Sequence, residues 1–210
     1  MIVGVLPFFH VFANACVLNR TVANGGCIAM LPRFDAGQAL KTLARVKATS
    51  IPGVPTMYQA LLDHPDMART DWSSLRVCIS GGAPMAAELK ARFEAATGAK
   101  LVEGYGLTET AAPSHSNPPD HPKKQCLGIP FLSVDARVVN PDTLEELPQG
   151  ESGEIVICGP QVFKGYWKRP DATAAAFFER EGKSFFRSGD MGRVDEEGYF
   201  FMTDRLKRMI

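Results

Sequence analysis

The chain has 210 residues, of which 45% are hydrophobic and 22% are charged, which is typical of an ordinary globular protein. Lysine plus arginine equals aspartate plus glutamate at 23 each, so no net charge attracts the chain to nucleic acid, and nucleic acid is excluded as a first-choice partner. The five cysteines lie far apart without a CxxC pair, which argues against a zinc site and a disulfide framework and favours a reducing cytoplasm.

The longest apolar stretch, residues 2–17, is interrupted by Gly4, Pro7, His10 and Asn14. It is too polar for a membrane-spanning helix, and it lacks the basic leader and the small-residue cleavage site of a signal peptide. We therefore predict no transmembrane segment and a cytoplasmic location, and we leave peripheral contact with a membrane open.

Three helices are predicted in residues 35–98, where helical and strand patterns alternate in the way that favours an α/β layer arrangement. Asp35 is expected to cap the first helix, and Pro55 to open the second. The third is expected to start at Pro84, to carry apolar residues at four-residue spacing, and to stop at Gly98. This part of the chain should therefore form an open sheet flanked by helices.

Two buried strands are predicted between the later helices, at "RVCISGG" (residues 76–82) and "KLVEG" (residues 100–104). The run "EGYGLTETAA" (residues 103–112) then begins at the carboxyl end of the second strand. Ligands usually bind at that edge of an open α/β sheet, so this run is the first candidate for a binding site.

The chain is expected to divide near residue 125, after a loop at residues 111–125 that is rich in proline and polar residues. Short strands and turns predominate beyond it, including a hairpin around residues 196–198, and only residues 170–178 look helical, with Asp171 as a cap. The predicted units are an α/β unit over residues 1–125 and a small, antiparallel, barrel-like β unit over residues 126–204.

Single runs allow both a structural and a functional interpretation. "SGGAP" (residues 80–84) is typical of a tight strand-to-helix turn or of a glycine turn that binds anions, but it fits no dinucleotide or P-loop spacing. In "YGLTE", Tyr105 between two glycines could cover a flat ring, while Thr108 donates to an anion and Glu109 holds Mg²⁺. The same Thr108 and Glu109 could instead cap a helix.

The same ambiguity affects the remaining runs. Asp190 in "FRSGDMG" could accept hydrogen bonds from two ribose hydroxyls, or it could belong to an ordinary turn. His10 follows apolar residues, where a lone histidine is more often a core or wall residue than a catalyst. "DRLKRMI" (residues 204–210) could be an exposed charged segment. Taken one at a time, these runs decide little.

The order of the runs is much more specific. The succession "PFFHVFA", "SGGAP", "EGYGLTET", "LGIP", "GEIVICGPQVFKGYW", "FFRSGDMG" and "GYFFMTDRLKRMI" resembles the core signatures of the adenylate-forming enzymes. These include acyl-CoA synthetases, 4-coumarate ligases, beetle luciferases and peptide-synthetase adenylation domains. The resemblance covers essentially all 210 residues and is strongest to the bacterial fatty acyl-CoA ligases.

The resemblance implies a site for ATP and an acyl-adenylate. Tyr105 would stack on the purine, Asp190 would bind both ribose hydroxyls, and Arg205 would reach the ribose or phosphate side. The other positions implied to line the nucleotide are Gly81, Gly82, Ala83, Glu103, Gly104, Gly106 and Met202.

The resemblance also implies catalytic and hinge positions. Thr108 would contact the α-phosphate, Glu109 would hold Mg²⁺, and His10 would lie at the carboxylate end of the acyl pocket. Lys207 matches the hinge about which a C-terminal domain rotates, so residues 205–210 would begin that hinge. The implied reaction has two steps: the carboxylate attacks the α-phosphorus of MgATP to give acyl-AMP and pyrophosphate, and the thiol of coenzyme A then releases AMP.

Two parts of the family pattern are not found. Upstream of "PFFHVFA" the family has a Ser/Thr/Gly-rich loop that binds the β- and γ-phosphates, and downstream it has a small domain with the lysine that drives adenylation. We therefore expect a middle portion of a ligase, and we expect these 210 residues alone to bind adenosine weakly and to show no turnover.

The sequence leaves three candidate functions for this chain. An acyl-CoA ligase for a fatty or other hydrophobic acid is favoured. A peptide-synthetase adenylation domain predicts an aspartate at the position of His10 to hold the substrate ammonium, and "FFHVF" has none. The third is a non-catalytic fragment for nucleotide binding or protein interaction. Acyl chain length and self-association stay open.

Overall fold

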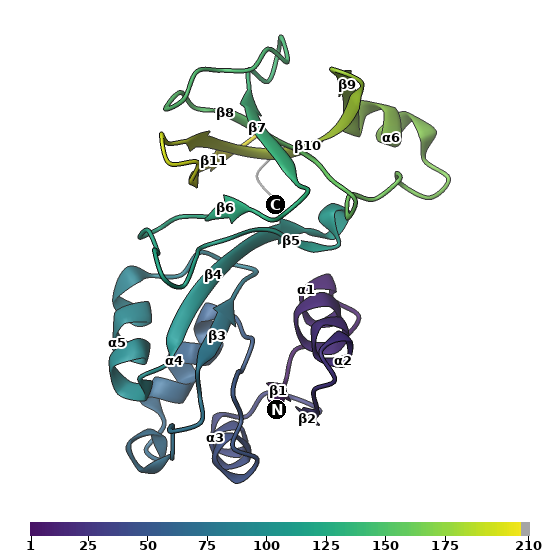
Figure 1. The fold of residues 1–210 in the computed structure, drawn as a ribbon. Helices are drawn as coiled ribbons and strands as arrows, with labels where there is room; N and C mark the ends of the chain where they lie inside the picture. Colours follow the sequence, from purple (N-terminus) through teal and green to yellow (C-terminus); the bar gives the residue numbers. More distant parts are fainter. Residues whose placement is uncertain (207–210) are drawn as a thin grey trace.

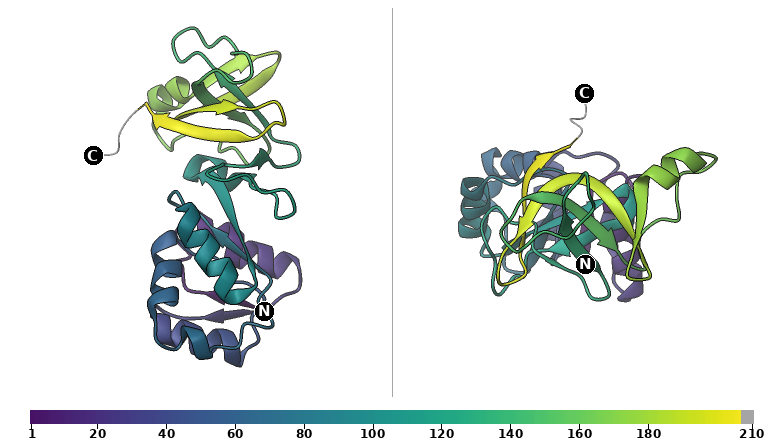
Figure 2. Two further views of the ribbon diagram at one scale, coloured as in Figure 1. Left: turned by 90° about the vertical axis from the view of Figure 1, so that its left-hand side faces the viewer. Right: turned by 90° about the horizontal axis from the view of Figure 1, so that it is seen from above.

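The computed structural model describes residues 1–206, which form two units stacked one above the other (Figures 1 and 2). In Figure 1 the N-terminal elements make the lower unit, strands β7 to β11 make the upper one, and the sheet of β4, β5 and β6 lies between them. Lys207 falls outside the described residues, so its assignment as a hinge stays a prediction.

The lower unit contains parallel strands linked through the segment 50–53. Strand β1 (Ile2–Gly4) pairs with β2 (Ile28–Met30), and β3 (Val77–Ser80) pairs with β4 (Lys100–Leu107), both in parallel. Isolated bridges from Ile2 to Ser50 and from Gly53 to Ser80 connect the two pairs. The expected open α/β sheet is therefore confirmed.

Helices flank these strands, as Figure 1 shows. Asp35 caps α3 by accepting a hydrogen bond from the Gln38 amide at 2.8 Å, and Pro55 opens α4, both as predicted. The helical elements of this unit are α1 (Val11–Ala13), η1 (Asn14–Asn19), α2 (Arg20–Ala23), α3 (Ala36–Arg45), α4 (Pro55–Asp63), η2 (Met67–Arg69) and α5 (Ala87–Thr97). In the part of the chain that the structure describes, none of the helices has the length and apolar character that crossing a membrane requires.

The expected start of α5 was wrong by three residues. The helix begins at Ala87 instead of Pro84, because Ala86 is still extended and Met85 packs into the core before the first turn forms. Its end is as predicted, since Gly98 adopts a left-handed conformation that closes the helix.

The segment expected to be a loop at residues 111–125 contains a strand. β4 runs to Leu107, the short helix η3 (Thr108–Thr110) follows, and β5 (Ala112–Ser116) then pairs antiparallel with β4. The sequence of β5 is polar and therefore predicts a loop. In the fold its polar residues Ser114 and His115 are fully buried. The run beginning at Glu103 therefore lies within a hairpin and not beyond the end of a strand.

The upper unit is an open antiparallel sheet with strand order β11-β10-β8-β7, and β9 pairs with β10. Because no pairing joins β7 to β11 within residues 1–206, the expected barrel does not close. Asp171 does not cap α6, since Arg169 holds the cap position and Pro170 the first turn. The elements are β7 (Asp135–Val139), β8 (Gly153–Cys158), α6 (Pro170–Ala176), β9 (Phe177–Arg180), β10 (Lys183–Val194) and β11 (Phe200–Arg205).

The two units share a core at the hairpin of β4 and β5. Short strand β6 (Ile129–Pro130) pairs with β5, and a bridge from Gly128 to Phe200 joins that sheet to β11. Tyr105 from β4 packs in one cluster with Val138, Ile155, Ile157 and Phe200 of the upper unit. Burial of this apolar surface fixes β4 beneath β8 and β10, while a division of the chain at residue 125 stays a prediction.

Candidate functional site

A cleft of ≈ 980 Å³ contains nine of the predicted site positions. Its walls come from both units: the start of α1, the turn after β3, the β4–η3 segment, α6, and the middle of β10 with the end of β11. The predicted positions that line it are His10, Gly81, Gly82, Gly104, Tyr105, Gly106, Thr108, Glu109 and Arg205. Residues nearly 200 positions apart in the sequence therefore meet in one site.

A cluster of three side chains joins the two units beside this cleft. The Tyr105 hydroxyl donates a hydrogen bond of 2.7 Å to Asp190 Oδ2, and the Arg205 guanidinium donates to Asp190 Oδ1. Asp190 is 0% exposed, whereas the Arg205 side chain is 37% exposed. Burial, and then the neighbouring Asp190 charge, raises the pKa of Tyr105, so the phenol stays protonated and remains a donor.

The turn that carries Asp190 is held by Glu154, which sequence reasoning missed. Glu154 on β8 is 2% exposed, and its Oε1 accepts a hydrogen bond of 3.0 Å from the Gly189 amide. Its Oε2 accepts hydrogen bonds from Arg187 at 2.7 and 2.9 Å. Since a buried carboxylate requires such partners, the pair fixes residues 187–189 at the wall of the cleft.

Gly106 is required by the close approach of β5. A Cβ atom added there would lie 2.1 Å from the carbonyl oxygen of Ala112, a backbone atom that cannot turn away. At Gly104, a Cβ would meet nothing nearer than 3.7 Å. The two glycines around Tyr105 therefore differ: Gly106 is needed for the close pairing of β4 with β5, whereas Gly104 has room for a methyl group.

Glu109 offers a carboxylate to the cleft. It is half-buried on η3, and its Oε1 accepts a hydrogen bond of 2.8 Å from the Tyr166 hydroxyl. Thr108 beside it is exposed. Within residues 1–206 no group of three His, Cys, Asp or Glu could hold a metal ion by itself. One carboxylate beside a hydroxyl nevertheless fits Mg²⁺, which is commonly held by one or two carboxylates together with substrate phosphates.

His10 is exposed at the mouth of the cleft and is not a core residue. Its Nδ1 accepts a hydrogen bond of 3.2 Å from the Phe12 amide, so the ring caps α1. Phe12 and the buried Cys16 continue the lining from there. The wall next to His10 is therefore largely apolar.

Four predicted positions do not line the cleft. Asp190 lies directly behind the lining, buried under Tyr105 and Arg205. The Glu103 side chain forms an ion pair of 3.8 Å with Lys90. Met202 is 38% exposed on β11, and Ala83 is exposed in the turn after β3. The expected place of Met202 in the lining of the nucleotide site therefore stays a prediction.

His115 is a second residue that sequence reasoning missed. It is fully buried on β5, where its ring packs 5.6 Å from that of Tyr105 and 4.7 Å from that of Phe200. Nδ1 lies 2.9 Å from the Ser114 hydroxyl, while Nε2 has no partner among the described residues. Burial lowers the pKa of His115 to about 3, so the ring is neutral at physiological pH.

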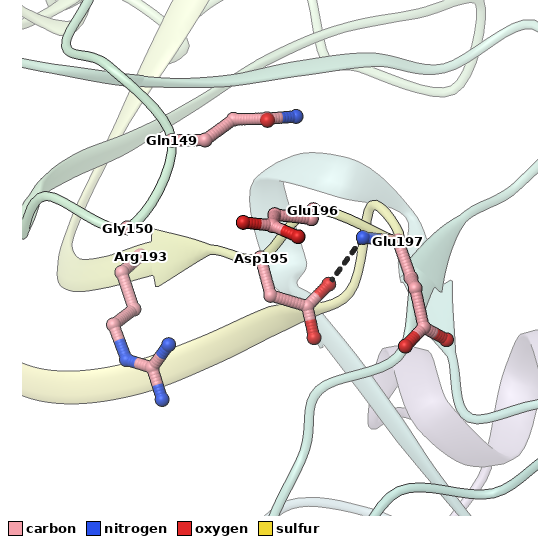
Figure 3. A pocket seen from close by; sticks show the side chains of 6 residues that line it. All are labelled: Gln149, Gly150, Arg193, Asp195, Glu196 and Glu197. Carbon is pink, nitrogen blue, oxygen red and sulfur yellow. Dashed lines mark hydrogen bonds between the residues drawn. The ribbon is translucent and has the colours of Figure 1, made fainter.

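A second hollow of ≈ 520 Å³ lies at the hairpin between β10 and β11 (Figure 3). Its walls are polar, and the Asp195 carboxylate accepts a hydrogen bond of 3.0 Å from the Glu197 amide. Lys123 neutralises part of this charge through ion pairs with Asp195 and Glu197. It contains none of the predicted site residues, so we assign the candidate site to the larger cleft.

Comparison with known proteins identifies the family of the chain. Residues 1–167 match the model of a family described as AMP-binding enzyme. The chain is 43% identical to a long-chain-fatty-acid–CoA ligase of Bacillus subtilis (strain 168), over the whole chain and 37% of that protein. It is 42% identical to a feruloyl-CoA synthase of an Amycolatopsis species, over 97% of the chain and 41% of that protein.

Solved structures also include proteins similar to this chain in both sequence and fold. The crystal structure of ATP-bound MatB from Rhodopseudomonas palustris superimposes with a TM-score of 0.89 and 38% identity, covering 100% of this chain and 41% of that one. The chain thus spans about two fifths of the length of the proteins it matches.

Proposed function

Because this chain belongs to the AMP-binding enzyme family, we propose that it forms part of a ligase that activates a carboxylic acid with ATP. The whole protein would convert a fatty or other hydrophobic acid to acyl-AMP and then to acyl-CoA, using ATP, Mg²⁺ and coenzyme A. These residues correspond to 37% of the Bacillus subtilis ligase, so the activity is proposed for the whole protein and not for these residues alone.

One observation carries this proposal. A single cleft joins the cluster of Tyr105, Asp190 and Arg205, which suits an adenosine, to Thr108 and Glu109, which suit a phosphate and its cation. β4 and η3 connect the two ends directly, because only two residues separate Tyr105 from Thr108. A nucleotide could therefore span them.

The ribose would bind at Asp190. Both carboxylate oxygens already accept protein donors, Tyr105 on one and Arg205 on the other. An ionised carboxylate has about four lone-pair sites, so it can accept further hydroxyls. Ribose binding then requires the partly exposed Arg205 side chain to move aside, whereas the buried Tyr105 can stay in place.

The reacting phosphates would lie at η3. Thr108 would donate its hydroxyl to the α-phosphate, and Glu109 would hold Mg²⁺, which supplies charge neutralisation when it is bound. For phosphoryl chemistry of this kind the protein contributes mainly positioning and electrostatic stabilisation. The hairpin of β4 and β5 supports that task because it anchors η3 to the shared core.

The acyl chain would lie toward α1. Val11, Phe12 and Cys16 line the cleft beside His10, and none carries a charge that could hold the ammonium of an amino acid. Phe9 is 93% exposed and does not contribute. This lining favours a hydrophobic acid, and it disfavours the adenylation domain that the sequence left as an alternative.

A pyrophosphate-release screen tests the proposed function. The purified whole protein, of which these 210 residues form part, would be incubated with MgATP and either fatty, aromatic or amino acids, and acyl-CoA formation would be followed after addition of coenzyme A. We expect turnover with hydrophobic acids only. Preference for an amino acid would contradict the substrate class, and AMP binding without turnover on any acid would favour the non-catalytic alternative.

A further inference from the structure

The Glu109 carboxylate is reached by a hydroxyl from a distant loop. Tyr166 lies in the loop between β8 and α6, and its hydroxyl donates to Glu109 Oε1 at 2.8 Å. Both side chains line the cleft. In addition, the Phe163 amide donates a hydrogen bond of 2.8 Å to the Glu109 carbonyl oxygen. One loop therefore holds both the backbone and the side chain of Glu109.

Tyr166 is itself fixed, although it is 39% exposed. Its amide donates to Thr173 Oγ1 at 2.9 Å, and its ring meets that of Phe163 edge-on at 4.8 Å. Phe163 in turn packs against the rings of Phe177 and Phe186. This aromatic group is anchored on β9 and β10, so the hydroxyl is delivered from the upper unit to η3.

Gly165 allows this close docking of the loop on α6. Its φ is +136°, and a Cβ atom there would lie 2.4 Å from the Thr173 side chain. A side chain at this position would displace Tyr166, whose amide hydrogen bond goes to the same threonine. The tight loop and the hydroxyl contact are thus parts of one arrangement.

We propose that Tyr166 is a positioning residue, which orients the Glu109 carboxylate so that its second oxygen is available to a divalent cation. This inference rests on the metal role of Glu109 in the proposed function. A carboxylate on a short helix can rotate, and a charge-assisted hydrogen bond to one oxygen fixes the plane of the group. Partners of this kind behind a metal ligand commonly change metal affinity by about 10- to 100-fold.

The protonation state of Tyr166 agrees with a donor role. Burial, and then the hydrogen bond and charge of Glu109, raise the pKa of Tyr166 to about 12. The phenol therefore keeps its proton across the physiological range and remains a hydrogen-bond donor to Glu109.

Cation-dependent nucleotide binding tests the inference without turnover. ATP binding to the purified protein would be measured by calorimetry with and without Mn²⁺ as the probe cation. We expect Tyr166→Phe to weaken the cation-dependent gain about tenfold, at the low end of the range for such partners, and to leave cation-free binding unchanged. Tyr199→Phe is the matched control, because it also removes a bonded phenol, one that donates to the His121 carbonyl outside the cleft.

The outcomes separate the inference from the function on which it rests. If Glu109→Gln abolishes the cation-dependent gain and Tyr166→Phe retains it, the inference is wrong and the role of Glu109 stands. If Glu109→Gln has no effect on that gain, the metal role of Glu109 is wrong, and the inference falls with it. Equal loss of cation-free and cation-dependent binding in Tyr166→Phe means a structural role and also overturns the inference.

A second measurement needs no metal or nucleotide. Tyrosine would be replaced by 3-fluorotyrosine, whose ring fluorine lowers the phenol pKa, and the Tyr166 signal would be followed by fluorine NMR as pH rises. Its loss in Tyr166→Phe identifies the signal. We expect Glu109→Gln to move the ionisation of this phenol to lower pH, because the neighbouring negative charge is removed. An unchanged midpoint shows that the two groups do not interact and refutes the inference.

Discussion

Replacement of Asp190 by alanine is the most direct test of the adenosine end of the site. The carboxylate is fully buried, and it accepts hydrogen bonds from Tyr105 and Arg205. In the proposed function it also accepts the ribose hydroxyls. The substitution should therefore affect both nucleotide binding and folding stability, and the structure permits an estimate of each.

The loss of binding follows from the type of hydrogen bond. Hydrogen bonds to a charged group are worth about 1.5–3 kcal/mol each, so losing the ribose contacts should cost at least one such bond. That cost corresponds to a roughly 10- to 150-fold higher dissociation constant for AMP or ATP. The apparent constant for the acid should change little, because the predicted acyl lining near His10 belongs to the other unit.

The loss of stability comes mainly from Tyr105. Its buried hydroxyl would lose its acceptor, which costs about 1–3 kcal/mol of unfolding free energy. Arg205 should contribute less, because its side chain is 37% exposed and can be hydrated when its partner is removed. Asp190→Asn retains an oxygen for the Tyr105 hydroxyl and should recover most of the stability.

Calorimetry with AMP and urea unfolding would be carried out on Asp190→Ala, Asp190→Asn and Asp142→Ala. Asp142 is an exposed carboxylate after β7 and outside the cleft, and its replacement should change neither quantity. If Asp190→Ala lowers stability and leaves AMP binding as tight as in the unmodified protein, Asp190 is a structural residue, and its assignment to ribose is wrong.

Two further predictions concern β4 and β5. Burial lowers the pKa of His115 to about 3 from the ordinary value of 6.5, so the unfolded chain binds the additional proton between these values. The stability that His115 contributes is therefore present above pH 6.5 and is lost as pH falls toward 3, by up to about 1.4 kcal/mol per pH unit. Urea unfolding should show that the stability of His115→Phe depends less on acid pH than that of the unmodified protein. The exposed control His121→Phe should keep the acid dependence of the unmodified protein. Gly106→Ala should destabilise the fold by about 1–3 kcal/mol, because its methyl group meets the Ala112 carbonyl at 2.1 Å, whereas Gly104→Ala should stay within about 0.5 kcal/mol in thermal unfolding. Equal melting temperatures for these two variants would contradict the close approach of β5 at Gly106.

The sequence determined those parts of the fold that depend on local signals. Asp35, Pro55 and Gly98 act as predicted at helix ends, because caps and left-handed turns need only neighbouring residues. The buried run 77–80 and the hairpin of β10 and β11 were also evident from apolar pattern and turn residues. The order of the signature runs indicated the family, which the family model over residues 1–167 then confirmed.

Tertiary contacts decided the remainder. β5 has a polar sequence, and only its pairing with β4 and the burial of Ser114 and His115 reveal a strand. No pattern in the sequence indicated that Tyr105 and Arg205 would both donate hydrogen bonds to the buried Asp190 carboxylate.

The candidate site divides in the same way. The residue types of Tyr105, Thr108, Glu109 and Asp190 allowed a nucleotide site, but only the resemblance carried by the order of the signature runs assigned them to one. Glu154 and Tyr166 both lie in the signature run at residues 153–167, but the run does not indicate which partners their side chains contact. Those partners lie 35 and 57 residues away along the chain, and hydrogen bonds over such separations are set by packing of the two units and not by local sequence.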